Sequence, residues 1–286
     1  MSAAGRTGKA QPAAPEPADA AARTRTAQPA NPAEHTDTAL VGFTAVAGAE
    51  IDRLFRAAMA AAGRFGGPRL RSRYGPGAGE LLIDFRTVLA APDGFVTATA
   101  LAEVLRYGEQ VEIEASVRRA IDRGLIDRDD RGVIRATTAG HMFLDDLYAI
   151  QAEALGPIWA GASDVVDRLA AVAGDLVADA SLHPVLPAGA FAAMTPNYEP
   201  AEVPAPVLLL NRLSAMRYHR SDAHAVAWRT AGLTAQQMVA IQAAGGSPRD
   251  AIERRTNEIA APPFAIIDTA LRHAVLDDLR LLPVPD

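Results

Sequence analysis

The feature that most constrains the fold is a change of hydrophobic period within residues 97–140. Before Gly124 the apolar residues recur at helical spacing in two short segments, which Tyr107-Gly108 separates. After Gly124 they alternate on both sides of the polar turn 128–132, a pattern typical of a two-stranded hairpin. We therefore expect, in order, a helix capped by Thr97 or Thr99, a helix over about 110–123, strands near 125–126 and 133–134, and a helix from Thr137.

Two other segments lack any regular pattern. Residues 1–39 contain almost no large apolar side chain, so they cannot offset the entropy of ordering and are expected to be disordered. Residues 183–206 are rich in proline, which predicts a long connector. Further helices are expected over residues 41–63, 80–89, 163–182, 207–229, 234–242, 248–260 and 264–282, with a Gly-rich stop and a basic loop between the first two.

These elements predict a mainly α fold, namely a winged helix-turn-helix with a small β-wing and an α-helical C-terminal region. The expected domains are a disordered Ala/Pro-rich tail (1–39), a winged helix-turn-helix domain (40–160) and an α-helical dimerisation and ligand-binding region (161–286). A chain of 286 residues that is 49% hydrophobic can bury cores of this size.

The composition narrows the classes of function. The chain has no cysteine, which excludes disulfides, thiolate catalysis and cysteine-bound zinc. Its net charge of -6 argues against indiscriminate binding to nucleic acid, although a local basic patch remains compatible with it. No run of about 18 apolar residues occurs, so we expect a cytoplasmic protein without membrane contact.

The second helix of the predicted helix-turn-helix is the one that would enter the major groove. Its first turns carry Glu109, Glu112 and Glu114, which repel phosphate, whereas arginines gather toward its C-terminal end and in the hairpin. Two interpretations stay open: the segment binds double-stranded DNA, or it has become a structural or dimerisation module. If it binds DNA, the expected contacts are Gln110, Ser116, Arg118, Arg119, Arg128, Arg131 and Arg135.

A second basic segment precedes the helix-turn-helix. Arg64, Arg69, Arg71 and Arg73 lie among glycines and a proline, so they could bind a phosphate backbone or an anionic ligand. A solvated, flexible linker is an equally good interpretation of the same composition.

The densest cluster of chemically active side chains is in residues 216–228. His219 and Asp222 share one helix face, whereas His219 and His224 are about 140° apart around the helix and cannot both bind one metal. The cluster could form a ligand pocket, whose candidate residues are Tyr218, His219, Asp222, His224 and Trp228.

Two alternatives to a pocket remain for this cluster. In the structural one, Asp222 orients His219 or pairs with a neighbouring arginine, and Trp228 packs in the core. A metal or catalytic site would need Glu258 or His273 from another helix, and nothing in the sequence requires it. Because no phosphate-binding loop, nucleophile elbow or HExxH motif occurs, we expect no cofactor, no metal site and no catalytic residue.

The order of helix, tight turn, helix, wing and long helix, with a Gly-Leu-Ile at 124–126, an acidic turn and a Thr-x-x-Gly at 137–140, resembles the MarR-type winged helix. The HRxDxH segment at 219–224, with Gly-Leu at 232–233, and the IExxTNxxAxxP segment at 252–263 are similar to motifs of actinobacterial MarR-like proteins and the SCO-type helix-turn-helix family. Asn257 stands where that family usually has aspartate, and the winged helix precedes both motifs. The resemblance implies architecture and lineage but no reaction.

The first functional hypothesis is therefore a MarR-like transcriptional regulator. It would bind double-stranded DNA as a homodimer and respond to a small-molecule effector held by the C-terminal helices. The rival is an enzyme or ligand-binding protein of specialised metabolism that keeps the winged helix as a scaffold and uses the His219-Asp222-His224 segment. A third possibility is a protein-interaction module that binds through the helix over residues 163–182.

Overall fold

Most of the described residues lie in helices, and the one small sheet among them is an antiparallel pair of strands. The computed structural model describes residues 37–200 and 202–284. Its helices are α1 (Thr38–Tyr74), α2 (Glu80–Asp84), α3 (Arg86–Leu89), α4 (Ala98–Val104), α5 (Gln110–Asp122), α6 (Thr138–Trp159), α7 (Ser163–Leu182), α8 (Ala190–Met194), α9 (Ala205–Thr230), α10 (Ala235–Ala244), α11 (Ser247–Ala260) and α12 (Thr269–Leu281). Strands β1 (Ile126–Arg128) and β2 (Ile134–Ala136) form the hairpin, and Ala160–Ala162 and Pro262–Ile266 are 3₁₀ turns.

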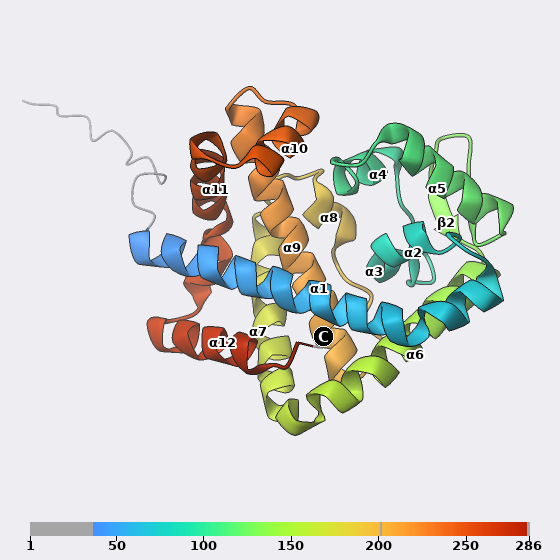
Figure 1. Cartoon of the computed structure of the whole chain (residues 1–286), viewed down its shortest axis with the longest axis horizontal. Helices are drawn as coiled ribbons and strands as arrows, with labels where there is room; N and C mark the ends of the chain where they lie inside the picture. Colours follow the sequence, from blue (N-terminus) through green and yellow to red (C-terminus); the bar gives the residue numbers. More distant parts are fainter. Residues whose placement is uncertain (1–36, 201, 285–286) are drawn as a thin grey trace, which may run out of the picture. The chain divides into compact units, whose positions relative to one another are not determined.

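The first helix differs most from the prediction. Almost all of the expected tail, residues 1–39, lies outside the described residues, and α1 begins at Thr38, with the Asp37 carboxylate accepting from the Ala39 N–H at 2.9 Å. The helix then continues through the glycines and Pro68 to Tyr74. The expected Gly-rich stop and basic loop are therefore wrong: the arginines of that segment lie on the last three turns of a helix (Figure 1).

Packing against α6 explains why the helix continues. A Cβ atom on Gly66 would lie 2.3 Å from the Ile150 side chain, so glycine lets the two helices approach closely. Arg69 and Arg73 then form ion pairs with Glu153 and Asp146 of α6, each at 2.7 Å. These contacts override the low helical propensity of glycine and the missing N–H of proline.

Substitutions at two glycines of α1 should have opposite effects on stability. Gly66→Ala should destabilise the fold by about 1–3 kcal/mol, because the added methyl overpacks the contact with Ile150. Gly63 is exposed in the same helix, with open space where a Cβ would lie, so Gly63→Ala should stabilise by up to about 1 kcal/mol. Urea unfolding of both variants tests this, and shifts of the same sign would contradict the packing explanation.

The elements expected between residues 97 and 140 are present. Thr97 caps α4 by accepting from the Ala100 N–H at 3.0 Å, and Thr137 caps α6 by accepting from the Gly140 N–H at 3.1 Å. In the hairpin, Ile126 pairs with Ala136, and a further bridge joins Val96 to Ile134. The helix expected over 80–89 is instead two short helices, α2 and α3, which meet at Phe85.

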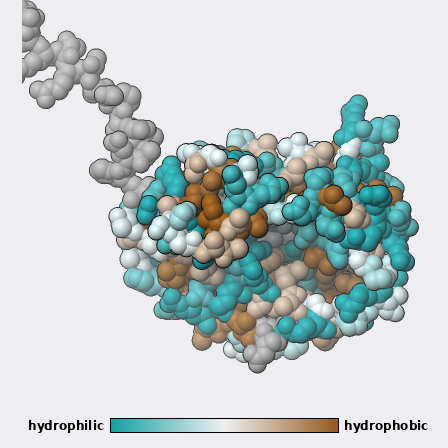
Figure 2. Space-filling view, turned by 45° about the horizontal axis from the view of Figure 1, so that its top comes forward, coloured by the Kyte–Doolittle hydropathy of each residue, from teal (hydrophilic) through white to brown (hydrophobic). Residues whose placement is uncertain are grey.

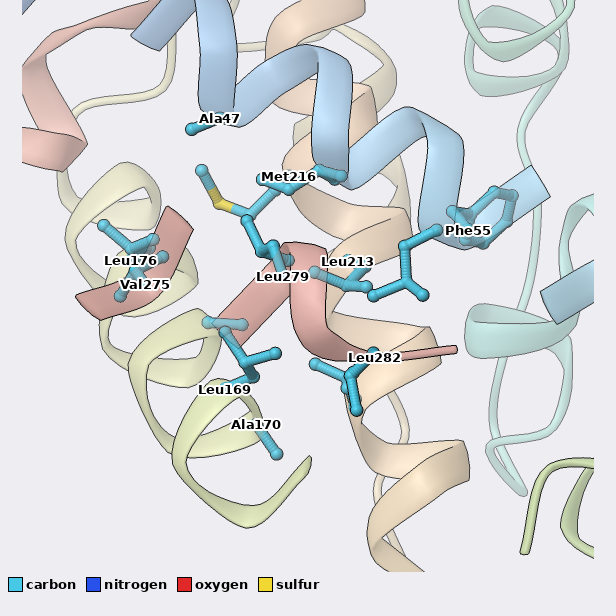
Figure 3. Close-up of a cluster of buried hydrophobic side chains, with 14 of the residues drawn as sticks. Ala47, Phe55, Leu169, Ala170, Leu176, Leu213, Met216, Val275, Leu279 and Leu282 are labelled. Atoms are coloured by element: carbon cyan, nitrogen blue, oxygen red, sulfur yellow. The ribbon is translucent and has the colours of Figure 1, made fainter. Parts of the chain in front are cut away.

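The two largest apolar cores hold most of the described residues together. The larger lies between α1, α7, α9 and α12 and includes Phe55, Leu169, Leu213 and Leu279 (Figure 3). The second lies under α2 to α5, the hairpin and the start of α6. Because the larger core joins residues before and after 160, the residues from 37 on form one compact unit. The apolar face of α7 is buried in this core, so it is not available to a protein partner.

The remaining expectations concern the C-terminal half. The predicted bounds of the helix over 163–182 match α7, and α9, α10 and α11 lie close to their predicted positions. The proline-rich connector contains one short helix, α8, which packs on α4 and α9. The helix expected over 264–282 is wrong at its start, because Pro262–Ile266 forms a 3₁₀ turn and Asp268 caps α12.

Candidate functional site

The site is a cavity of about 880 Å³ that is lined by α1, α9, α10 and α11 and by the end of α4. Three of the predicted pocket residues, Tyr218, His219 and His224, line it. The space-filling view in Figure 2 shows a molecular surface that is hollowed near its centre, where hydrophilic and apolar side chains meet. The cavity volume lies in the range that small-molecule sites occupy.

Small residues of α1 provide the room for this cavity. Ala45, Gly48 and Ala49 line it over little more than one helical turn, where larger side chains would fill it. Gly48 also accommodates the Arg220 side chain, since a Cβ atom there would lie 3.2 Å from the Arg220 Cδ. The apolar part of the wall comes mainly from Ile51, Val104, Met216, Met238, Val239 and Phe264.

Arg220 joins the two C-terminal segments that carry the sequence motifs. From α9, its guanidinium donates to the Asn257 side chain at 2.6 Å and to Glu253 of α11 at 2.8 Å. Glu253 also accepts from Gln242 of α10 at 3.1 Å. The HRxDxH and IExxTNxxAxxP segments are therefore parts of one polar network at the cavity wall.

A hydrogen-bonded chain connects Trp228, Tyr107 and His224. The Trp228 indole N–H can only donate, and it donates to the Tyr107 hydroxyl at 3.0 Å. That hydroxyl is also hydrogen-bonded to the His224 Nδ1, 2.8 Å away. The His224 Nε2 lies 3.8 Å from a Glu253 oxygen. Burial lowers the pKa of His224, and the charge of Glu253 acts in the opposite direction.

His219 has no charged partner. Its ring meets the ring of Phe191 edge to face, with centroids 5.5 Å apart, and its Nδ1 is buried without a hydrogen-bond partner among the described residues. Burial lowers the pKa of His219 to about 4. The imidazole is therefore neutral near pH 7.

Asp222 has a structural position instead of the expected place in the pocket. Its carboxylate is fully buried, forms an ion pair with Arg106 and accepts from the N–H groups of Ala190 and Phe191, both at 2.9 Å. It thus caps α8, and it orients neither His219 nor an arginine of its own helix. A Cβ on Gly189 would lie 2.3 Å from the Asp222 carboxylate, so this approach requires glycine. Trp228 also lies outside the cavity wall, in the small core with Met238 and Ile252.

The turn between α4 and α5 packs on α9, and its contacts there include Asp222, His224 and Trp228. Arg106 donates to the Ser221 carbonyl at 3.1 Å in addition to its ion pair with Asp222. Tyr107 contacts both His224 and Trp228, and Glu103 of α4 accepts from Arg229 at 3.0 Å. Val104 and Tyr107 also line the cavity, so the end of α4 is part of its wall.

Several of the side chains expected to contact DNA are already bound to neighbouring glutamates. Arg119 pairs with Glu80 and Arg128 with Glu114, at 2.8 and 2.9 Å. Gln110 lies within 3.5 Å of the Glu114 carboxylate. Arg118 and Arg131 are exposed, and Ser116 is half-buried. Arg135 stacks on Phe95, with its guanidinium carbon 4.9 Å from the ring centroid.

The cavity has an excess of hydrogen-bond donors. The two carboxylates in its wall already accept: Asp52 from Arg56 and Arg217, and Glu253 from Arg220 and Gln242. Arg249 also lines the cavity and makes no hydrogen bond or ion pair within the described part of the chain. The hydrogen-bonding groups of the wall that remain free for a ligand are therefore mainly the N–H groups of arginines.

The sequence alone did not predict which residues of other elements contact the 216–228 segment. Arg106, Tyr107 and Glu253 lie far along the chain from residues 216–228, and only the tertiary structure brings them to α9. The one available signal was the pair of motifs at 219–224 and 252–263, whose residues meet at Arg220.

No family model, curated protein or solved structure matches this chain. Within residues 37–200 and 202–284, no three His, Asp or Glu side chains are grouped so that they could hold a metal ion. None of the helices described combines the length and apolarity needed to cross a bilayer.

Proposed function

We propose that the protein is a transcriptional regulator that binds DNA through its α4–α5 and hairpin segment and responds to a small molecule in the cavity. The single observation that carries the proposal is that Val104 and Tyr107, at the end of the first helix of this segment, form part of the cavity wall. A ligand that displaces Tyr107 from His224 changes how α4 is held on α9. Such a ligand has different affinities for the docked and released states, which is the requirement for regulation.

The ligand that suits this cavity is an organic molecule with an apolar body and a negatively charged, acceptor-rich group. The arginines of the wall outnumber its carboxylates, and those carboxylates are already occupied by donors. Charge-assisted hydrogen bonds from arginine bind carboxylate, sulfonate and phosphate groups well. The apolar body would pack on the side chains contributed by α1, α10 and α11.

One experiment with a cavity-filling variant tests the proposal. Binding of the full chain to duplex DNA, including its own upstream region, is measured from about 50 to 200 mM salt, with and without 8-anilinonaphthalene-1-sulfonate as the probe. We expect the parent to bind with a steep salt dependence and the probe to change its affinity. Ala49→Trp should bind DNA but lose the response, because the indole fills the cavity. Ala60→Trp, on an exposed position of α1 outside the cavity, should behave as the parent.

Two outcomes would contradict the regulator. Absence of DNA binding at the low-salt end removes the regulatory function altogether. DNA binding that the probe leaves unchanged, although the probe occupies the cavity, removes the coupling between the two sites.

A second candidate is the enzyme or ligand-binding protein that keeps this segment only as a scaffold. The observation that favours it is the pairing of Arg119 and Arg128 with glutamates, which reduces the charge that the segment offers to phosphate. Probe binding at the cavity without any DNA binding would support this candidate.

A further inference from the structure

Two arginines of α5 lie beside the turn that follows α1, although the sequence separates them from it by about forty-five residues. The guanidinium of Arg123 lies next to Gly75, the C-cap of α1: a Cβ there would be 2.7 Å from it. Arg119, one turn earlier on α5, lies in the same way beside Gly77, with its Nε 3.3 Å from a Cβ built there. Arg71 is one helical turn before Gly75 and is exposed.

We propose that this surface, formed by Arg71, Arg119 and Arg123 and called here the α1–α5 basic surface, binds the phosphate backbone of duplex DNA. The inference rests on the proposed function, and it deepens it by stating which end of α5 approaches the backbone. A helix in the major groove has a phosphate backbone on each side of it, so its flanks are where phosphate contacts form.

The distribution of charge along α5 determines which end of the helix can approach the phosphate backbone. The N-terminal end carries Glu109, Glu112 and Glu114, and it repels phosphate. Arg128 of the hairpin is paired with Glu114, so the exposed cations that the hairpin offers are Arg131 and Arg135. The C-terminal end is therefore the end of α5 that phosphate can approach.

The cations of the surface are available to a polyanion. Arg71 and Arg123 are exposed and form no hydrogen bond or ion pair through their side chains within the described residues. Arg119 pairs only with the exposed Glu80, and an exposed pair of this kind contributes little, so phosphate can replace the glutamate. Asp122, Asp145 and Asp146 are further acids near this surface, and Asp146 is already bound by Arg73 and Tyr74.

The occupant is duplex DNA and not an anionic membrane. A membrane-binding surface interleaves its cations with apolar side chains that enter the bilayer. Arg119 and Arg123 lie beside the glycine and proline turn at 75–77, which offers no large apolar side chain for that purpose. The Arg71 guanidinium lies farther back along α1, 3.3 Å from a Cβ built on Gly67.

The test compares two triple variants that remove the same charge. Arg71→Ala/Arg119→Ala/Arg123→Ala should lower the affinity for duplex DNA at least about tenfold and reduce the slope of log K against log salt by about 0.9 for each phosphate that the protein no longer neutralises. The control replaces Arg254, Arg255 and Arg280, which are exposed on α11 and α12, and should keep the slope of the parent. The corresponding triple lysine variant at 71, 119 and 123 should recover the slope, which a merely structural effect of arginine would not explain.

Three outcomes would overturn the inference. A parent-like slope in the alanine triple variant shows that the DNA lies elsewhere, and loss of the slope in Arg128→Ala/Arg131→Ala/Arg135→Ala would then place it on the hairpin and leave the proposed function intact. Binding to phosphatidylserine vesicles but not to duplex DNA would mean that the partner of this surface is an anionic membrane and not DNA. No DNA binding by the parent overturns the inference and the proposed function together.

Discussion

Replacing Asp222 with alanine should destabilise the protein by about 3–5 kcal/mol, the largest effect that we expect of a single substitution. The carboxylate is fully buried and is the partner of Arg106, whose side chain is only 4% exposed. Removing it leaves the buried guanidinium with Glu103, 3.3 Å away, as its one remaining carboxylate partner among the described residues, and the loss of a buried partner costs far more than the net contribution of the pair. The N–H groups of Ala190 and Phe191 lose their acceptor as well.

Further variants distinguish charge from hydrogen bonding at this position. Asp222→Asn keeps one acceptor oxygen for α8 but no charge, so its loss should be smaller than that of alanine. Combining Asp222→Leu with Arg106→Met removes both charges and should recover part of the loss of Asp222→Ala. Asp164→Ala, which breaks an exposed pair with Arg168, is the matched control and should leave stability nearly unchanged.

Denaturant unfolding measured by circular dichroism provides these values. If Asp222→Ala were no less stable than Asp164→Ala, the buried pair would not hold α4 and α8 on α9. The proposed route from the cavity to α4 would then lose its anchor.

The second large effect concerns pH. Burial lowers the pKa of His219 from 6.5 to about 4, so the unfolded chain binds a proton at this residue more readily than the folded chain. The resulting contribution to stability is fully present above pH 6.5 and is lost as the pH falls toward 4. At about 1.4 kcal/mol for each pKa unit, the loss amounts to roughly 3 kcal/mol.

Asp84 changes stability in the opposite direction over part of this range. The residue as a whole is exposed, but desolvation of its carboxyl group raises its pKa to about 6, so it stabilises the folded state at low pH and this contribution disappears as the pH rises from 3.8 to 6. The pH dependence of the parent alone is therefore a poor measure of His219. The informative quantity is the difference between the parent and His219→Phe, which cannot titrate and keeps an aromatic ring beside Phe191.

We expect the free energy of unfolding of His219→Phe, relative to the parent, to rise by roughly 3 kcal/mol between pH 7 and pH 4. Urea unfolding at half-unit intervals measures this difference, and values at pH 8 provide the baseline for packing effects. A difference that stays constant across the range would mean that His219 is not held neutral by the fold.

The local elements were predictable because their signals are local. Thr97 and Thr137 indicated the starts of α4 and α6, Gly124 the end of α5, and the alternation around residues 128–132 the hairpin. The helix over 163–182 was predicted closely, because its apolar stripe is regular. The same reasoning failed at residues 63–74, where contacts with α6 outweigh local propensity.

By itself, the sequence determined a mainly helical chain with one hairpin, and it singled out the segment around His219 and His224. Tertiary structure alone decided which of these residues share a site, because their partners come from distant elements: Arg106 removes Asp222 from the pocket, and Tyr107 and Glu253 join His224. The physical reason is that hydrogen-bond and ion-pair partners are chosen by distance in space. Helical periodicity indicates which face a residue occupies but not which element packs against that face.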